Sequence, residues 1–415
     1  MHRRRRGMGR LAFALACLSA CTACLADADT LKQAFEAAWA RQPEAVALRL
    51  RREAAQAQQQ AALAWTPEPP AVTVSNKTDR FNRDLGVHEL EVGVAIPLWL
   101  PGERSRSGAL AEAEMRGVES RALAVQLRMA GALREAWWQW QRAQVDVDMA
   151  RDQLASARAL AADVAKRLKA GDLARADQHQ ADGAVAAAES TEARALAALA
   201  GTVQQLRTAS VGAVALASHA APLVAEPEPS VATAAVDLAD HPSFRDLQDR
   251  AAVAEGAAAL GAVRSRANPE LTLAATRERD LRGERYEPSI TLALRIPFGA
   301  GSRHAARTAS AQAEATELQT QVLLERERIG AEQEAARTRV AAARTQLAAA
   351  DRRAQLAGES RGFFDKSFRL GETDLPTRLR IEAEAVEARR QAASARIEVA
   401  AAISQWRQAL GLLPE

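Results

Sequence analysis

The stretch ELEVGVAIPLWLPG, residues 89–102, decides the fold. Its apolar side chains alternate with small or polar ones, at Leu90, Val92, Val94, Ile96 and Leu98. Strict alternation of this kind is typical of a β-strand with one apolar face. A second copy, SITLALRIPFGAG, occupies residues 289–301, and both copies end in Ile-Pro and a glycine-containing turn. The sequence therefore predicts two equivalent strands in a chain that otherwise favours helix.

The two copies belong to an internal repeat that runs through most of the chain. Gln42-Pro43 aligns with His241-Pro242 and Gly171 aligns with Gly371, at an offset of about 200 residues. A proline-bearing segment, APLVAEPEPS at 221–230, separates the halves. We predict a signal peptide at 1–26, a first repeat at 27–221, a linker at 222–230 and a second repeat at 231–415.

Each repeat has the same expected order of elements. A helix (29–64 and 231–266) precedes a strand (71–80 and 270–279), which leads into the alternating strand. A very long helix follows (103–170 and 302–370), then a glycine turn and a last helix (173–217 and 374–410). Helices of this length are rods of about 100 Å. The first of them carries a heptad-like seam at Val118, Ala122, Val125, Met129, Ala132 and Ala136. The predicted fold class is mainly α with a small β part, built from long antiparallel coiled-coil helices.

The first residues have the pattern of a secretory signal. Arginines at residues 3–6 precede the apolar stretch LAFALACLSACTACLA at 11–26, which is shorter than the roughly 20 residues of a membrane-spanning helix. All three cysteines, Cys17, Cys21 and Cys24, lie here, so no disulfide framework is expected in the mature chain. Two interpretations stay open: cleavage after Ala26 or Ala28, or lipidation at Cys21 within the sequence LSAC.

The four expected strands have the length of transmembrane β-strands. Strands in a bilayer must close into a barrel, and four cannot do so. Eight strands from two chains leave no aqueous channel, whereas twelve from three chains enclose a lumen, so we predict a trimer if the strands lie in a membrane. The expected lipid-facing residues are Leu90, Val92, Val94, Ile96, Ile290, Leu292, Leu294 and Ile296.

Aromatic residues near the strand ends fit an interfacial girdle, although they would also fit the ends of a soluble sheet. These residues are Trp65, Phe81, Trp99, Tyr286 and Phe298. Trp137, Trp138 and Trp140 fall inside a long helix and are expected in its packing core.

No pattern of residues predicts chemistry. The net charge of +3 gives no electrostatic case for nucleic acid, and the 6 histidines are scattered without ligand spacing on one helix face. The motifs of phosphate-binding loops, serine hydrolases and zinc proteases do not occur. We therefore expect neither an enzyme nor a cofactor or metal site.

The chain resembles the TolC-like outer-membrane efflux proteins over nearly all of its mature length. The resemblance rests on the duplicated layout, the segment TLKQAFEAAWARQPE at 30–44, the paired IPL and IPF strands and the turns at Gly171 and Gly371. LWLPGERS at 98–105 looks like members found with heavy-metal pumps. The resemblance implies a homotrimer with a twelve-stranded barrel in the outer membrane and an α-barrel through the periplasm.

The resemblance also implies partners and a tip. The channel would be a passive exit duct for heavy-metal cations or small toxic compounds. They would come from an inner-membrane pump, expected to be of the resistance-nodulation-division type, through a periplasmic adaptor (membrane fusion protein). Residues expected at the adaptor-docking tip and aperture are Gly171, Asp172, Leu173, Gly371, Asp374, Leu375, Thr377 and Arg380. Thr377 and Arg380 stand where related channels often carry carboxylates, which argues against an acidic selectivity ring.

Two alternatives have no channel. One is an extracytoplasmic coiled-coil scaffold, and the other is a periplasmic adaptor. A scaffold would be soluble, whereas a channel needs detergent for extraction. An adaptor has one helical hairpin beside a β-domain rich in short strands, whereas this chain repeats the hairpin layout and has no such domain.

Overall fold

The computed structural model describes residues 26–27, 30–82, 84–215, 224–230, 237–298 and 301–415. Residues 1–25 of the predicted signal peptide, which include Cys21, therefore lie outside the described residues. The predicted linker is described from residue 224 onward. The chain divides into two compact units. We call residues 1–46, 126–236 and 332–415 the helical unit, and residues 47–125 and 237–331 the sheet unit. Each unit draws on both halves of the chain.

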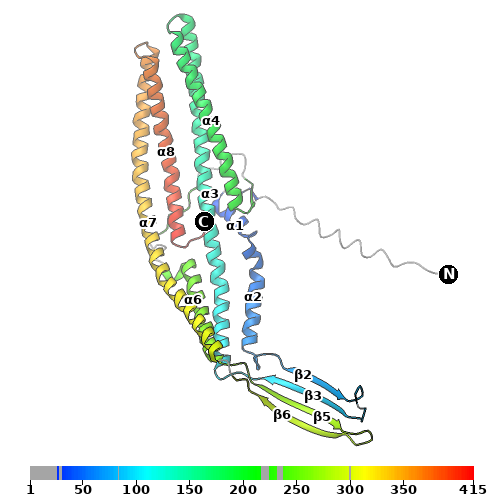
Figure 1. Ribbon diagram of the computed structural model, residues 1–415. Coiled ribbons are helices and arrows are strands. Elements are labelled where there is room, and N and C mark those ends of the chain that lie inside the picture. The colour runs from blue at the N-terminus through cyan, green and yellow to red at the C-terminus, as the bar shows by residue number, and fades with distance from the viewer. Residues whose placement is uncertain (1–25, 28–29, 83, 216–223, 231–236, 299–300) are drawn as a thin grey trace, which may run out of the picture. The chain divides into compact units, whose positions relative to one another are not determined.

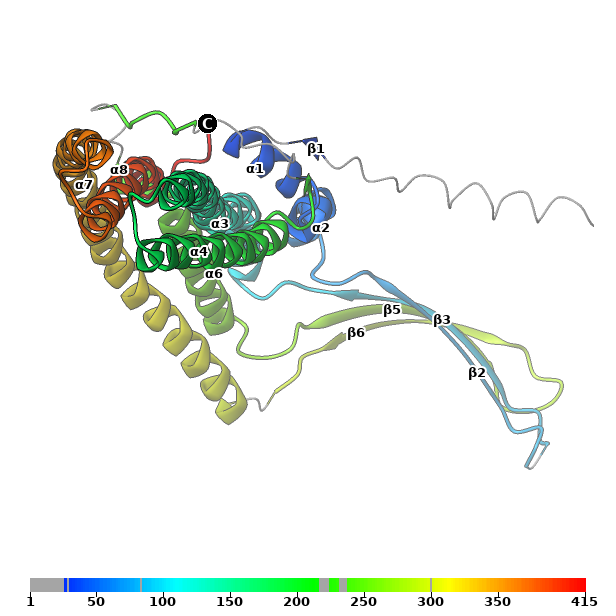
Figure 2. The same cartoon turned by 90° about the horizontal axis from the view of Figure 1, so that it is seen from above.

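The sheet unit holds a four-stranded sheet in the order β2-β3-β5-β6 (Figure 1). Its strands are β2 Ala71–Thr78, β3 His88–Pro97, β5 Glu270–Arg279 and β6 Glu287–Arg295. All neighbours are antiparallel, and the β3–β5 pairing joins the hairpin of one repeat to that of the other. Figure 2 shows that the sheet curves along its length. Both strands that the alternating patterns predicted are therefore confirmed.

The β2 strand ends two residues before the predicted limit because Asp79 closes the hairpin turn. Its carboxylate accepts hydrogen bonds from the backbone N–H groups of Leu85 (2.7 Å) and Gly86 (3.2 Å). Its own backbone N–H donates to the carbonyl of Val87 at 3.4 Å. An aspartate that bonds backbone groups in this way favours a turn over a longer ladder.

Proline divides the first predicted helix, so the single helix expected at 29–64 is wrong. The structure has α1 Leu31–Trp39 and α2 Pro43–Ala62 instead. The residue before a proline is pushed out of the helical region, whereas proline itself suits the first helical position. The same rule applies in the second repeat, where a short 3₁₀ turn, η1 Leu238–Asp240, precedes α6 Pro242–Val263. That helix therefore begins at 242 and not at 231.

Four long helices form two hairpins, α3–α4 and α7–α8 (Figure 1). They are α3 Glu103–Ala170, α4 Arg175–Ala209, α7 Gly301–Arg369 and α8 Leu375–Ala409. The 68 residues of α3 and the 69 of α7 agree with the predicted bounds to within a residue. At a rise of about 1.5 Å per residue each is about 100 Å long. None of the described helices is both long and apolar enough to cross a bilayer.

The core of the helical unit gathers around the tryptophans of α3. The rings of Trp137 and Trp140 meet edge to face at 5.1 Å, and both are buried with Leu133 and Leu206. This confirms the prediction that these tryptophans lie in a packing core. The predicted seam is only partly right, because Ala132 is exposed while Leu133 is fully buried. Leucine and tryptophan bury far more apolar area than alanine, so they set which face of the helix turns inward.

Each hairpin turns at a glycine with a left-handed backbone, φ 88° at Gly171 and 79° at Gly371. The N–H of Asp172 donates to the Arg167 carbonyl at 2.9 Å, and the N–H of Glu372 donates to the Ser367 carbonyl at 3.0 Å. These bonds satisfy carbonyls that the helix end would leave without partners, in the Schellman arrangement. Both glycine turns are therefore helix stops built in the same way.

Candidate functional site

The apolar residues of the four strands share one face of the sheet. In the register, Val94 lies opposite Leu273, and Leu273 lies opposite Leu292. Directly opposed residues of antiparallel strands point to the same side. Seven of the eight residues predicted to face lipid lie in strands on this apolar face, and Ile296 follows the end of β6. The face is open to the surroundings, with Leu292 71% and Val94 39% exposed.

The opposite face carries small and polar residues, and its centre is closed. Gly93 and Ala274 lie opposite each other there, and both are buried. A Cβ added at Gly93 would come within 3.0 Å of the Ala274 side chain, so a larger residue would force the strands to shift. The sheet is thus the reverse of a soluble one: its apolar face is exposed and its small-residue face is partly buried. Such a continuous exposed apolar surface marks contact with lipid or protein.

Both outer strands of the sheet have an open edge. Within the described residues, β2 pairs only with β3, and β6 pairs only with β5. An open edge leaves a row of backbone N–H and C=O groups that water, another strand or another chain must satisfy. In an apolar environment water is absent, so these edges require partner strands.

The predicted girdle residues lie at the two ends of the strands. Phe81 is in the β2–β3 loop and is 96% exposed, while Trp65 (80%) and Phe298 (85%) lie at the ends that lead to helices. Trp99 is half-buried, and its indole N–H donates to the Ala64 carbonyl at 3.3 Å. Tyr286, before β6, is half-buried under arginine side chains.

A buried carboxylate, which the sequence reasoning missed, ties the strand ends to the helices of the sheet unit. Glu103 begins α3 and is completely buried. It accepts hydrogen bonds from the Arg264 guanidinium and the Asn268 side-chain amide, both at 2.6 Å, and from the backbone N–H of Leu100 at 3.0 Å. The sequence signal was a glutamate directly after Pro101-Gly102, where a helix start favours negative charge.

The predicted tip residues play different parts in the turns. Leu375 is only 1% exposed and packs with Phe368, Leu160 and Val164, so it belongs to the core of the tip. The tip residues that are exposed are Gly171, Asp172, Gly371, Asp374 and Arg380. Leu173 and Thr377 are partly buried.

Asp374 caps α8. Its carboxylate accepts the backbone N–H of Thr377 at 3.1 Å. Hydrogen bonds from the Thr377 side chain and backbone lower the pKa of Asp374 below its ordinary value. Arg380 forms an ion pair with Glu384 one turn further along, at 2.7 Å. Asp374 and Arg380 thus each have a partner one turn or less along the same helix.

A cation–π contact joins the two hairpins near their tips, and sequence reasoning missed it. The guanidinium carbons of Arg167 and Arg378 lie 4.9 and 4.7 Å from the ring centre of Phe368. Arg167 also donates to the Phe368 carbonyl at 3.0 Å, and Arg378 pairs with Asp365. A cavity of about 700 Å³ with both acidic and basic groups in its wall lies between the hairpins. No local pattern reveals this contact because its residues come from three different helices.

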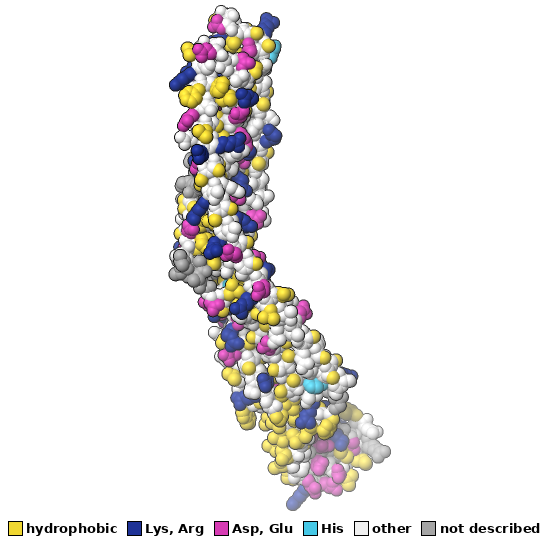
Figure 3. Space-filling model, turned by 90° about the vertical axis from the view of Figure 1, so that its left-hand side faces the viewer, with side chains coloured by type: hydrophobic (Ala, Val, Ile, Leu, Met, Phe, Trp, Pro, Cys, Tyr) yellow, Lys and Arg dark blue, Asp and Glu magenta, His cyan; other side chains and the backbone are white. Residues whose placement is uncertain are grey.

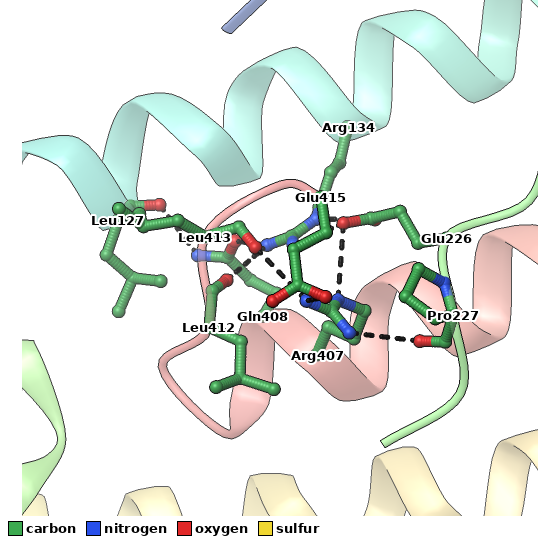
Figure 4. Close-up of polar contacts among 9 residues, drawn as sticks. All are labelled: Leu127, Arg134, Glu226, Pro227, Arg407, Gln408, Leu412, Leu413 and Glu415. Carbon is green, nitrogen blue, oxygen red and sulfur yellow. Dashed lines mark hydrogen bonds and ion pairs between the residues drawn. The ribbon is translucent and has the colours of Figure 1, made fainter. Parts of the chain in front are cut away.

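A second missed cluster holds the segment between the repeats against the helical unit (Figure 4). The Glu226 side chain is 2% exposed and accepts two hydrogen bonds from Arg134, at 2.7 and 2.9 Å. Arg407 lies 3.4 Å from the same carboxylate and donates to the Pro227 carbonyl at 3.0 Å. Arg134 also donates to the side chain of Gln408 at 2.6 Å. We call these residues the strap anchor, because they bind residues 224–230 to α3 and α8.

The helical surface carries charge of both signs. Lys and Arg side chains alternate with Asp and Glu along the face of the hairpins in Figure 3. Many of them form ion pairs within or between helices, such as Arg142–Glu398 and Arg158–Glu189. Among the described residues, no group of three His, Cys, Asp or Glu side chains is placed to hold a metal ion. The mixed and paired charges give this surface the character of a solvated wall.

Comparisons with known proteins agree with this geometry. Residues 34–212 match the family model described as outer membrane efflux protein. No curated protein sequence matches the chain.

Solved structures share the fold. One is the outer membrane protein VceC from Vibrio cholerae, with TM-score 0.71 and 16% identity over 93% of this chain and 97% of that one. Another is the open state of the MtrE outer membrane channel of Neisseria gonorrhoeae, with TM-score 0.71 and 13% identity over 92% and 89%. A third is the CmeC outer membrane channel of Campylobacter jejuni, with TM-score 0.70 and 13% identity over 92% and 85%. The sequence match and the shared fold agree with the exposed apolar sheet: residues 34–212 match the outer membrane efflux protein family, and the chain as a whole has the fold of these outer membrane channels.

Proposed function

We propose that this chain works as a homotrimeric passive exit duct. It would do so as the outer-membrane channel component of an efflux pump, with a large helical part in the periplasm. The observation that carries the proposal is the sheet with an exposed apolar face and two open edges. Three copies would bring twelve strands together, pair every edge and enclose a lumen lined by the small and polar face. A coiled-coil scaffold in water would leave the same face exposed without a partner.

The helical hairpins would continue the duct in the periplasm. Their mixed charges and paired ions suit a wall in contact with water. The glycine turns would form the end that meets a periplasmic adaptor, and through it an inner-membrane pump of the resistance-nodulation-division type. The exposed residues Asp172 and Glu372 stand at these turns and are available for docking.

The cargo would pass without tight binding. A conduit needs a wide polar lumen and no set of convergent ligands, so heavy-metal cations and small toxic compounds are both compatible with it. The rows of Thr73, Thr291 and Ser289 on the small-residue face supply neutral polar groups to such a lumen. No catalytic step is required, because the pump supplies the driving force.

A mass measurement tests whether the protein is a trimer. We expect full-length protein purified from membranes to require detergent and to give three times the chain mass by native mass spectrometry. A matched sample in denaturant should give the single chain. A monomer or dimer in detergent, or full extraction without detergent, would contradict the proposal.

A further inference from the structure

The apolar face of the sheet ends in a basic and aromatic cluster beside the hairpin loops. Leu273, Ala275, Arg277 and Arg279 follow one another at every second position of β5, so all four are on the same face. In the register, Arg277 lies opposite Leu90. The two arginines therefore extend the row of apolar side chains at its loop end.

The tyrosine ring of Tyr286 supports both arginines. The guanidinium carbon of Arg277 lies 4.3 Å from its ring centre and that of Arg279 lies 4.9 Å away. His88 meets the same ring edge to face at 5.9 Å. A guanidinium stacked on an aromatic face keeps its N–H edge free for a planar or tetrahedral anion. The cluster is thus a fixed pair of donors and not two freely moving side chains.

Three loop carboxylates near the cluster have partners of their own, and Glu278 and Glu287 lie opposite each other on the small-residue face. Asp79 and Glu284 accept backbone N–H groups of their own loops, and Asp84 pairs with Arg282. Among the described residues neither Arg277 nor Arg279 has an ion pair with a carboxylate. Arg279 donates to the Gly86 carbonyl at 3.2 Å, whereas Arg277 has the Tyr286 ring as its contact. The loop end of the apolar face therefore has positive charge without a protein counter-ion.

The position of the cluster matches the boundary of an apolar layer. Arg277 lies six residues from Leu271 along β5, which is about 20 Å at 3.4 Å per residue. The apolar band of an outer-membrane barrel is about 25 Å tall. The helices leave the sheet at its other end. If the chain spans the outer membrane as proposed above, the arginines stand at the level of the outer-leaflet headgroups.

We propose that Arg277 and Arg279 bind the phosphate group of an acidic lipid in the outer leaflet, whose acyl chains lie along Val92, Ile290 and the neighbouring apolar side chains. Charge and shape select this occupant. Apolar chains match the exposed face, and the phosphate supplies the counter-ion that the protein lacks. The inference rests on the proposed function, because it needs the sheet to be in the membrane.

The test compares lipid binding by three versions of the full-length protein in detergent micelles. They are the wild type, Arg277→Gln and Lys77→Gln, the last being a control on the opposite face at the same end of the sheet, where Lys77 pairs with Glu89. The probe is diphosphorylated lipid A, titrated by native mass spectrometry. We expect Arg277→Gln to weaken binding at least about fivefold, because it removes a charge-assisted phosphate contact. Lys77→Gln should bind like the wild type.

Two further arms identify the ligand chemistry. Lipid A without its phosphates should bind the wild type about as weakly as the intact lipid binds Arg277→Gln, and inorganic phosphate should not compete. Equal binding by wild type and Arg277→Gln, or equal binding of both lipids, would overturn the inference. Competition by inorganic phosphate would show a free-anion site and would overturn the lipid assignment. The same spectra report the oligomer: a trimer without lipid preference rejects only this inference, whereas a monomer rejects the proposed function.

Discussion

Neighbouring residues of β6 belong to opposite environments. Leu292 lies on the apolar face and Thr291 on the small-residue face, and both are exposed. We expect Leu292→Arg to cost about 2–4 kcal/mol near the bilayer midplane and to reduce the amount of assembled trimer. Thr291→Arg puts the same charge toward the lumen and should assemble normally. The amount of heat-resistant trimer in isolated outer membranes measures the assembly of each variant. Equal assembly of the two variants would show that Leu292 does not face lipid.

The cap of α8 has a predictable pH dependence. The pKa of Asp374 is lowered by hydrogen bonds from Thr377, so its folded value lies below its unfolded value. The cap therefore contributes stability above the unfolded pKa of about 3.9, and this contribution is lost as the pH falls through the folded pKa. Asp374→Ala should increase amide exchange in the first turn of α8 at pH 7, and the difference from wild type should disappear at low pH.

Asparagine is the matched control for this cap. Asp374→Asn keeps an oxygen acceptor for the Thr377 N–H but cannot titrate. Asp374→Asn should retain much of the protection of the first turn of α8 from amide exchange at pH 7. Because residue 374 then has no titrating group, this site should cause no change in protection as the pH falls. Hydrogen exchange measured by mass spectrometry on peptides that cover 371–381 reports both effects. Equal protection of wild type and Asp374→Ala at pH 7 would contradict the assignment.

The contact between residues 224–230 and the helices α3 and α8 depends on one buried carboxylate, Glu226. Among the described residues, Glu226 is the only carboxylate that contacts both Arg134 and Arg407, and all three side chains are nearly fully buried. We expect Glu226→Gln to destabilise the helical unit by about 3 kcal/mol, because breaking a buried pair leaves uncompensated charge. Glu228→Gln is the control two residues away, since Glu228 forms an exposed pair with Arg344 and should cost at most about 1 kcal/mol.

Thermal unfolding followed by circular dichroism measures how much the strap anchor contributes to stability. Limited proteolysis shows where the chain opens. Cleavage within residues 224–230 should appear early in Glu226→Gln and not in Glu228→Gln. Equal melting temperatures and equal cleavage of the two variants would show that the buried pair does not hold the segment.

The elements that sequence predicted well are those set by local patterns. Alternation found β3 and β6, and long runs of helix formers found α3 and α7 almost to the residue. The break before Pro43 was also visible locally, although the expected helix ran through it. The strap anchor and the stacking on Phe368 were not predictable, because Arg134 and Glu226 are 92 residues apart and Arg167 reaches a ring 201 residues away. Such contacts depend on how helices pack, which no short pattern encodes.

At the scale of the whole molecule, the apolar sheet and the glycine turns make opposite demands on their surroundings. The sheet has an exposed apolar face and needs lipid and neighbouring strands, whereas the turns expose charged residues such as Asp172 and Glu372. A chain whose strands are in a membrane and whose turns are in water meets both demands. The proposed duct assigns the strands to the outer membrane and the turns to the adaptor.

Crosslinking tests that assignment in cells. The predicted mature chain has no cysteine, so single cysteines can be placed at Asp172 and Glu372, which are exposed, and at Phe81 in a hairpin loop as the control. Leu375 is unsuitable because its side chain is buried in the tip. With a short thiol-reactive crosslinker in cells that carry the cognate adaptor, we expect adducts to that adaptor from residues 172 and 372 and none from residue 81. Adducts from residue 81 alone would reverse the orientation. Trimers that form normally but give no adduct from either turn would reject adaptor docking at these turns while leaving the channel itself intact.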